Sequence, residues 1–246
     1  MGGLNVVGTT RSLAERLVKW LAREIDEAGA SGALVGLSGG LDSATVAMLL
    51  TRAVPGRGMG LLMPCHSDPR DLSDGELAGQ AAGLPAATVE LSGAFDALMR
   101  ALDREGAAPP VARANVKPRL RMNALYFEAA RRNYLVIGTG NRTELELGYF
   151  TKYGDGGVDL LPLGGLWKTE VRQLAKELGV PAAIIERVPS AGLWAGQTDE
   201  GEMGLTYEEA DRYLATGEGS EKVSARVEEL RRRGSHKLRM PPIFVP

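Results

Sequence analysis

Short apolar runs that alternate with helical patterns constrain the fold of this chain more than any other feature. The runs cover residues 33–37, 58–64, 86–91 and 134–139. Apolar residues at helical spacing cover 11–28, ahead of the first run, and then 43–53, 74–83, 93–102 and 116–132. Strands separated by helices pair in parallel, with helices on both faces of the sheet. We therefore predict an α/β fold with a doubly wound parallel sheet.

This alternation also predicts where ligands bind. In open α/β sheets, ligands lie beyond the carboxyl ends of the strands, where loops turn into helices. We expect functional residues just after residues 37, 63, 91 and 138.

The second half of the chain contains two long segments without apolar periodicity, 148–166 and 189–204. Segments of this length in a compact domain are usually functional lids or disordered. Helices are predicted at 168–178, 206–215 and 220–232, the second with Thr206 as its N-cap.

Composition limits the class of protein. The chain has 246 residues, 44% of them apolar, and a net charge of −2, which offers no general attraction to nucleic acid or an anionic membrane. The single cysteine, Cys65, excludes an internal disulfide, and two histidines argue against a zinc cluster. The N-terminus lacks an export signal, and no run reaches the roughly 18 apolar residues of a membrane span. We expect a cytoplasmic protein with small-molecule partners.

The sequence GLSGGLDSAT, residues 36–45, lies between the first apolar run and a helical pattern. A glycine-rich turn at this place presents backbone N–H groups at the positive end of a helix, which predicts a phosphate site. Asp42 would repel phosphates unless a cation lies between them, which indicates magnesium. The lysine of a P-loop and the G-x-G-x-x-G fingerprint are both missing. The alternative is an ordinary turn with Asp42 as a helix N-terminal acid.

SGGLDS resembles the signature of the ATP pyrophosphatase superfamily, whose members cleave ATP to AMP and pyrophosphate. Other motifs are NVKPRLRM (115–122), GTGNRTELELGYFTKYGDGGVDLLPL (138–163), LWKTEVRQLAKELGVP (166–181), PSAGLWAGQTDEGEMGLTYEEAD (189–211) and HK (236–237). In order and spacing they resemble ammonia-dependent NAD synthetase along nearly the whole chain. The resemblance implies an adenine nucleotide alpha-hydrolase-like fold, a ligase of NAD biosynthesis, and a homodimer.

The reaction that the resemblance implies is the amidation of deamido-NAD, with ATP as co-substrate. ATP adenylates the nicotinate carboxylate and pyrophosphate leaves, after which ammonia displaces AMP and NAD is formed. The protein would act by positioning and charge stabilisation, with no nucleophilic side chain.

The resemblance also implies the site residues. ATP would bind at Gly36, Leu37, Ser38, Gly39, Gly40, Leu41, Asp42 and Ser43, and at Thr139, Lys168 and Ser190. Asp42 and Glu144 would hold magnesium, while Asp42 and Lys168 would be catalytic, the lysine neutralising charge as pyrophosphate leaves. Deamido-NAD would bind at Arg119, Lys152, Asp159, His236 and Lys237.

Several of these residues have an ordinary alternative. Glu144 and Glu146 suit surface acids of a short helix, Lys168 suits a solvated helix start, and His236 suits a surface histidine. The chain also has Gly140 and Asn141 where one common form of the family has Asp-His, which affects contacts around the adenine pocket.

Two other functions compete with NAD synthesis. One is a different pyrophosphatase of the superfamily, such as a tRNA-modifying or GMP-forming enzyme, which the single cysteine and net acidity disfavour. The other is a nucleotide sensor without turnover, which the presence of both Asp42 and Glu144 disfavours.

The length of the chain bears on the nitrogen donor. Glutamine-dependent relatives carry an additional N-terminal domain with a catalytic cysteine, and about 30 residues before the first run are too few for it. We expect a single NAD synthetase domain over residues 1–246 and free ammonia as the immediate donor. A separate glutaminase subunit stays an open alternative.

Overall fold

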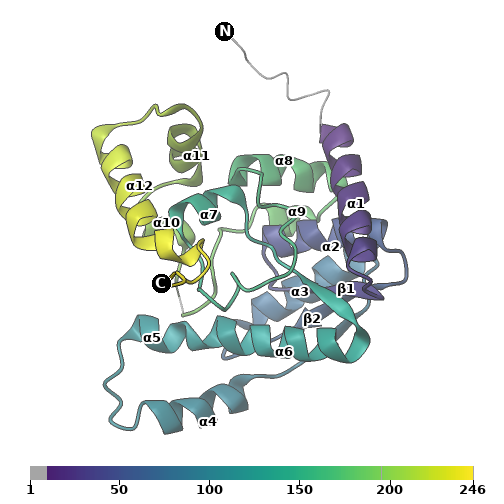
Figure 1. Ribbon diagram of the computed structural model, residues 1–246, viewed down its shortest axis with the longest axis horizontal. Coiled ribbons are helices and arrows are strands. Elements are labelled where there is room, and N and C mark those ends of the chain that lie inside the picture. The colour runs from purple at the N-terminus through teal and green to yellow at the C-terminus, as the bar shows by residue number, and fades with distance from the viewer. Residues whose placement is uncertain (1–9, 195, 246) are drawn as a thin grey trace.

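The computed structural model describes residues 10–194 and 196–245 and contains one parallel sheet (Figure 1). Its strands are β1 (Gly32–Gly36), β2 (Gly58–Leu62), β3 (Ala86–Thr88) and β4 (Tyr134–Ile137). They lie in the order β3-β2-β1-β4, and Leu34 of β1 pairs with Met59 on one side and Val136 on the other. The predicted doubly wound fold is therefore confirmed. Residues 1–9, part of the segment used to predict that no export signal is present, lie outside the described residues.

Helices connect the strands and continue after the last one. The first six are α1 (Thr10–Glu27), α2 (Leu41–Ala53), α3 (Pro69–Ala82), α4 (Ser92–Leu102), α5 (Pro110–Ala114) and α6 (Val116–Arg132). After β4 come α7 (Arg142–Leu147), α8 (Lys168–Leu178), α9 (Ala182–Ile185), α10 (Asp199–Met203), α11 (Tyr207–Thr216), α12 (Glu221–Gly234) and a 3-10 turn at Ser235–Lys237. None of the helices in the described ranges has the length and apolar character that crossing a membrane requires.

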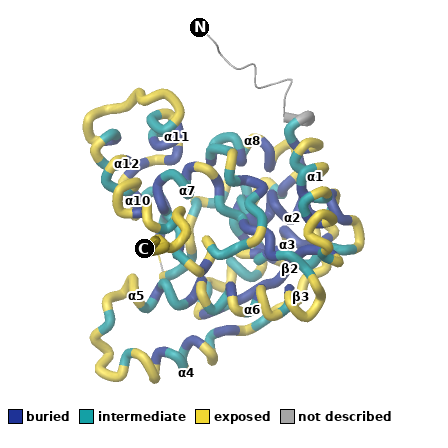
Figure 2. The backbone as a smooth tube through the Cα atoms, in the orientation of Figure 1, coloured by how far each residue is buried: buried dark blue, intermediate teal, exposed yellow. Residues whose placement is uncertain are grey.

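Both faces of the central strand β1 are covered, which explains why its sequence is continuously apolar, whereas the residues of the edge strand β3 are exposed. Alternate residues of β1 point to opposite faces: Val35 packs with α1, α2 and α8, whereas Leu34 packs with α4 and α6. Figure 2 shows this buried centre in dark blue. A third apolar cluster lies apart from the sheet, where α7, α10, α11 and α12 meet around Leu147, Tyr207 and Val227.

Element boundaries differ from the prediction where a cap rather than an apolar period sets them. Helix α3 begins at Pro69 instead of 74, because Asp68 caps it by accepting from the Arg70 N–H at 2.9 Å. The predicted N-cap Thr206 is present at α11, where it forms a capping box with Glu209. Segment 189–204 was expected to lack regular structure, which is wrong for α10; residue 195 lies outside the described residues.

Candidate active site

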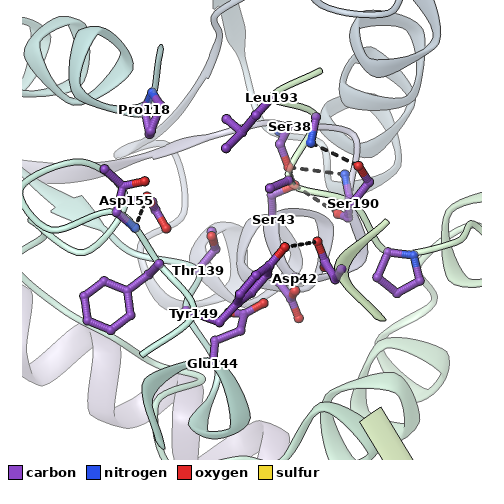
Figure 3. A pocket seen from close by; sticks show the side chains of 18 of the residues that line it. Ser38, Asp42, Ser43, Pro118, Thr139, Glu144, Tyr149, Asp155, Ser190 and Leu193 are labelled. Carbon is purple, nitrogen blue, oxygen red and sulfur yellow. Dashed lines mark hydrogen bonds between the residues drawn. The ribbon is translucent and has the colours of Figure 1, made fainter. Parts of the chain in front are cut away.

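The sheet order creates a switch point between β1 and β4, because the chain builds β2 and β3 on one side of β1 and β4 on the other. Ligands of doubly wound sheets bind at such a point. A cavity of about 700 Å³ opens there, lined by residues of the turns that follow β1, β2 and β4 (Figure 3). Among the residues that the structure describes, none between 89 and 110 lines it. The expectation of functional residues after 91 is therefore wrong, since β3 is separated by β2 from the switch point between β1 and β4.

The turn after β1 has the form of a phosphate loop. Gly39 has φ +79°, and a Cβ there would lie 2.6 Å from the Asp71 carbonyl oxygen, so the loop requires glycine. Gly40 is the N-cap residue of α2 and has no side chain that could cover the first N–H groups of that helix. The Ser43 hydroxyl donates to the Gly40 carbonyl at 2.9 Å and accepts from the Ser38 N–H at 3.3 Å. Ser43 therefore holds the loop in shape through its own hydroxyl.

The apolar residues of this loop face the core. Leu37 and Leu41 are buried, and a Cβ at Gly36 would lie 3.0 Å from the Met63 side chain. All three of these predicted ATP-binding positions also line the cavity.

Three charged side chains meet beside the loop. Lys168, at the start of α8, donates to Oδ2 of Asp42 and lies 3.9 Å from Oε1 of Glu144. Burial opposes the charge of Lys168, yet the two carboxylates together outweigh it and raise the pKa of Lys168. The alternative of a solvated helix start is therefore wrong for this lysine, which is 3% exposed.

The two acids of α7 have different environments. Glu144 forms a capping box with Asn141, in which Oε2 of Glu144 accepts from the Asn141 N–H at 3.1 Å. Its side chain is mostly buried, whereas Glu146 lies farther out and pairs with Arg231 at 3.4 Å. The surface-acid alternative therefore fits Glu146 and does not fit Glu144.

This cluster suits a divalent cation. Oδ1 of Asp42 is buried and, within the described ranges, has no hydrogen-bond partner. Burial, and after it the nearby Asp42, raises the pKa of Glu144 to about 8, and Lys168 opposes this shift. In the same described ranges, no three carboxylate, histidine or cysteine side chains converge as metal ligands. Phosphate oxygens and water would therefore have to complete a magnesium site, as is usual for this ion.

A third buried carboxylate, Asp199, was missed by sequence reasoning. It begins α10, and its two oxygens accept from the hydroxyls of Tyr207 at 2.9 Å and Tyr149 at 3.3 Å. Burial raises the pKa of Asp199, and Lys168 opposes this shift. The only available signal was the acidic sequence TDEGE within an otherwise aperiodic segment.

Asp211 of α11 is a second missed residue, and it joins the helices that carry Glu144 and Lys168. Oδ2 of Asp211 accepts from the backbone N–H and the hydroxyl of Thr169 at 2.9 and 2.8 Å. Oδ1 accepts from the Thr143 hydroxyl, which itself accepts from the Lys168 N–H at 3.0 Å. The N-terminal turns of α7 and α8 are therefore fixed to one buried carboxylate.

The other two predicted ATP-binding residues also reach the cavity. Thr139 follows β4, and Ser190 belongs to the segment before α10; both line the cavity. Figure 3 shows them with Ser38, Asp42 and Glu144. Ser190 accepts from the Gly192 N–H at 3.1 Å and is otherwise exposed.

The predicted substrate-binding residues lie mostly at the edge of the cavity. Arg119 donates to the Lys152 carbonyl at 3.3 Å, and Lys152 Nζ donates to the His236 carbonyl at 3.0 Å, so these three form a connected group. Lys237 lines the cavity itself, but its Nζ donates to the carbonyls of Gly148 and Phe150.

Asp159, the fifth predicted substrate residue, is exposed and contacts two other parts of the fold. Its Oδ1 accepts from the Tyr126 hydroxyl at 2.9 Å and its Oδ2 from the Val136 N–H at 2.7 Å. Neither Asp159 nor Arg119, Lys152 and His236 is among the described residues that line the cavity.

A parallel α/β sheet with a glycine-rich phosphate loop and buried carboxylates at its switch point defines a nucleotide-binding protein. The family model described as NAD synthase matches residues 13–241. The chain belongs to the NAD synthase family, and the resemblance found in the motifs is confirmed.

Relatives and solved structures agree with this assignment. The NH(3)-dependent NAD(+) synthetase of Carboxydothermus hydrogenoformans is 53% identical over 231 residues, which are 93% of this chain and 95% of the relative. The NMN synthetase structure from Francisella tularensis has a TM-score of 0.89 at 37% identity and covers 96% of this chain and 99% of its own. The NH3-dependent NAD synthetase structure from Campylobacter jejuni has a TM-score of 0.80 at 30% identity, with the same coverage.

Proposed function

We propose that this chain is an ammonia-dependent NAD synthetase, which converts the nicotinate carboxylate of deamido-NAD into the carboxamide of NAD. One observation carries the proposal: in a chain of the NAD synthase family, Asp42, Glu144 and Lys168 meet beside the phosphate loop. Residues 1–246 act as one domain. The reducing cytoplasm suits its single, buried cysteine, Cys65.

The reaction proceeds in two steps. A carboxylate oxygen of deamido-NAD attacks the α-phosphorus of ATP, the bond from this phosphorus to the bridging oxygen breaks, and pyrophosphate leaves. Ammonia then adds to the activated carbonyl carbon, AMP leaves with the former carboxylate oxygen, and the nitrogen loses one proton. Adenylation is needed because a carboxylate alone would have to expel oxide.

The residues of the chain position the substrates and balance charge. The first N–H groups of α2, together with Ser38 and Ser190, bind phosphate oxygens. Lys168 is held as an ammonium chiefly by Asp42, to which Glu144 adds when it is ionised, and it neutralises charge as pyrophosphate leaves. Asp42 and Glu144 would hold magnesium, which supplies positive charge to the phosphates when bound.

The size of the substrate is a further question, and nicotinate mononucleotide, whose amidation gives NMN, is a second candidate. The Francisella tularensis structure, with a TM-score of 0.89, is an NMN synthetase. We favour the dinucleotide because the curated relatives of 40–53% identity are NH(3)-dependent NAD(+) synthetases. A kcat/KM for deamido-NAD above that for nicotinate mononucleotide would support this choice, and the reverse order would overturn it.

A homodimer is part of the proposal. Tyr126 and Phe127 are exposed on α6, and Arg119 lies about two turns before them on the same face. The Tyr126 hydroxyl also contacts the predicted substrate residue Asp159. A second copy packed on this face would cover two aromatic side chains and border the substrate-binding edge of the cavity.

One assay tests the activity. The purified chain is incubated with ATP, magnesium, deamido-NAD and an ammonium salt, and AMP, pyrophosphate and NAD are expected in equal amounts. At fixed total ammonium the rate should rise with pH as free ammonia increases. Equal rates with glutamine would exclude ammonia as the immediate donor. Pyrophosphate release only with tRNA would support a tRNA-modifying enzyme, and ATP binding without AMP formation would support a sensor.

A further inference from the structure

The motif NVKPRLRM contains two basic residues to which the proposed reaction assigns no role. Lys117 and Arg121 lie one turn apart on α6 and point inward, whereas Arg119 between them is exposed. The Arg121 guanidinium donates to the Met63 carbonyl at 3.1 Å and to the Ser67 hydroxyl at 3.2 Å, in the turn that follows β2. The inner face of α6 is therefore bonded to loops of the cavity.

Lys117 has an unusual environment for an ammonium group. The residue is 7% exposed, and its Nζ donates at 2.9 Å to the backbone carbonyl of Leu193. The Phe95 ring lies 5.8 Å away, and no carboxylate in the described parts of the chain lies within 4.0 Å of the ammonium. Burial lowers the pKa of Lys117, and Arg121 adds to this effect. A buried charge that bonds only a neutral carbonyl is costly, so this contact needs a functional reason.

The Leu193 carbonyl belongs to a segment that we call the strap, residues 187–193. The strap carries Ser190, and all seven of its residues line the cavity. Its first residue, Arg187, donates to Asp71 and, at 2.6 Å, to Asp74, both on α3. At its other end, the Leu193 N–H donates to Oε1 of Gln197 at 2.8 Å.

The strap and the phosphate loop meet the same part of α3. A Cβ at Gly39 of the loop would lie 2.6 Å from the Asp71 carbonyl oxygen and 2.9 Å from Asp74 Cβ. Arg187 pairs with the carboxylates of these same two residues, and a Cβ at Gly192 of the strap would lie 3.3 Å from Oδ2 of Asp71. Arg187 therefore fixes the first end of the strap next to the phosphate loop, and Lys117 fixes the last.

We propose that Lys117 is a positioning residue, which holds the strap against α6 so that Ser190 faces the phosphates of ATP. The inference rests on the proposed function only through the placing of ATP at the phosphate loop. Lys117 is absent from the described residues that line the cavity, so its effect on ATP passes through the Leu193 carbonyl. Without this bond the strap keeps its bonds at Arg187, at the Pro189 carbonyl, which accepts from the Asp199 N–H at 3.0 Å, and at the Leu193 N–H, but it loses its link to α6.

The test uses Lys117→Met, which removes the ammonium and keeps an unbranched apolar chain beside Phe95. Binding of α,β-methylene ATP, which cannot be cleaved at the reacting bond, is measured by calorimetry. The affinity should fall about tenfold, as for the loss of one hydrogen bond from a charged donor. The affinity for deamido-NAD should stay within about twofold. Lys176→Met, on the exposed side of α8, is the matched control and should change neither.

Two further readouts separate positioning from a general structural role. Trypsin should cut after Arg187 several-fold faster in Lys117→Met, because the strap has lost its link to α6. Lys117 itself precedes Pro118 and is not a cleavage site. Lys117→Arg, which can still donate to the carbonyl, should restore most of the nucleotide affinity. If Lys117→Met does not fold, Lys117→Arg still tests the proposal, because its nucleotide affinity and its rate of cleavage should both stay close to those of the wild type.

Several outcomes would overturn the proposal. Unchanged nucleotide affinity and unchanged cleavage in Lys117→Met would show that the bond does not hold the strap. An equal loss of affinity for α,β-methylene ATP and for deamido-NAD would indicate a merely structural role. A complete loss of nucleotide affinity in Lys117→Arg, with a circular dichroism spectrum like that of the wild type, would also contradict the proposal. A failure of the wild-type chain to form NAD would instead contradict the proposed function, and the binding and cleavage results would still decide the role of Lys117.

Discussion

At the scale of single residues, the proposed chemistry depends most on Asp42. Its Oδ2 binds Lys168, and its Oδ1 is buried without a partner in the described ranges. We predict that Asp42→Asn lowers AMP formation in the complete assay by at least about 100-fold, because the amide can no longer hold magnesium or balance Lys168. Circular dichroism should stay close to that of the wild type, since the two side chains have the same shape.

Glu146→Gln is the matched control for this prediction. Glu146 lies two residues after Glu144 on the same short helix, but it pairs with Arg231 near the surface. This variant should retain near-normal turnover. Near-normal turnover in Asp42→Asn would remove magnesium coordination from the role of Asp42.

The raised pKa of Glu144 predicts a pH dependence of magnesium binding. Burial and Asp42 raise this pKa from 4.5 to about 8, so the folded protein holds the proton more tightly than the unfolded chain. Without metal, ionisation of this group therefore weakens the fold as pH rises from about 4.5 to about 8. Magnesium binds the ionised form, so its affinity should rise over the same range, with release of protons. Calorimetry at pH 7 in buffers of different ionisation enthalpy measures this release.

Glu144→Gln provides the comparison for the pH prediction. The glutamine cannot titrate, so metal binding should be weaker and the proton release should disappear. A wild-type protein that binds magnesium without releasing protons at pH 7 would contradict the role given to Glu144.

The candidate site could be predicted from sequence where its residues lie inside contiguous motifs. Asp42, Glu144 and Lys168 come from three such motifs, and the fold brings them together. Asp199 and Asp211 could not be found in this way, because their effect depends on how α10 and α11 fold back against α7 and α8. No local pattern in the sequence encodes that contact.

At the scale of elements, the positions of α7 and α8 depend on one hydrogen-bond acceptor, the Asp211 carboxylate of α11. We predict that Asp211→Ala lowers the free energy of unfolding by about 2–4 kcal/mol, because three donors, one of them fully buried, lose their buried acceptor. Turnover should also fall, because Glu144 is adjacent in sequence to the donor Thr143, and Lys168 to the donor Thr169. Urea denaturation and the complete assay measure the two effects.

Two variants of the same helix act as controls for Asp211. Asp211→Asn keeps one oxygen acceptor, so its loss of stability should be smaller than that of the alanine variant. Glu208→Ala removes an exposed acid that lies 3.7 Å from Arg172, and it should change stability by less than about 0.5 kcal/mol. Equal stability of wild type and Asp211→Ala would show that the contact does not hold the two helices.

Element length decides how well the fold could be predicted from the sequence. The bounds of α6 and α8 match the prediction, because helices of 17 and 11 residues show a complete apolar period. Helices α5, α9 and α10 have four or five residues, too few for a period to be visible, and all three were missed. The switch point at β1 and β4 could be anticipated only as a general property of such sheets. The strand order depends on which distant strands pair, and no single segment of the sequence determines this.

At the scale of the whole molecule, the separate cluster of α7, α10, α11 and α12 forms one side of the cavity. Gly148 ends α7 with φ +64°, and a Cβ at Gly234 of α12 would lie 2.6 Å from the Cα of Gly148. This close backbone contact places the following turn, with His236 and Lys237, beside residues 148–152. The predicted substrate-binding edge is therefore built from segments about 90 residues apart in sequence.

The proposed dimer makes a prediction at the same scale. Phe127 is 68% exposed on α6, on the face that also carries Arg119. We predict that Phe127→Glu shifts the protein from dimer to monomer, because the partner would have to bury an unpaired charge. The mass is measured by light scattering after size-exclusion chromatography.

Phe244→Glu is the matched control, since Phe244 is 87% exposed in the C-terminal segment and lies outside α6. It should leave the mass of the protein unchanged. If the partner borders the substrate edge, Phe127→Glu should raise the KM for deamido-NAD and leave binding of α,β-methylene ATP unaffected, because the phosphate loop lies at the switch point and Phe127 on the outer face of α6. A wild-type monomer, or a Phe127→Glu dimer with normal KM, would show that this face has another role.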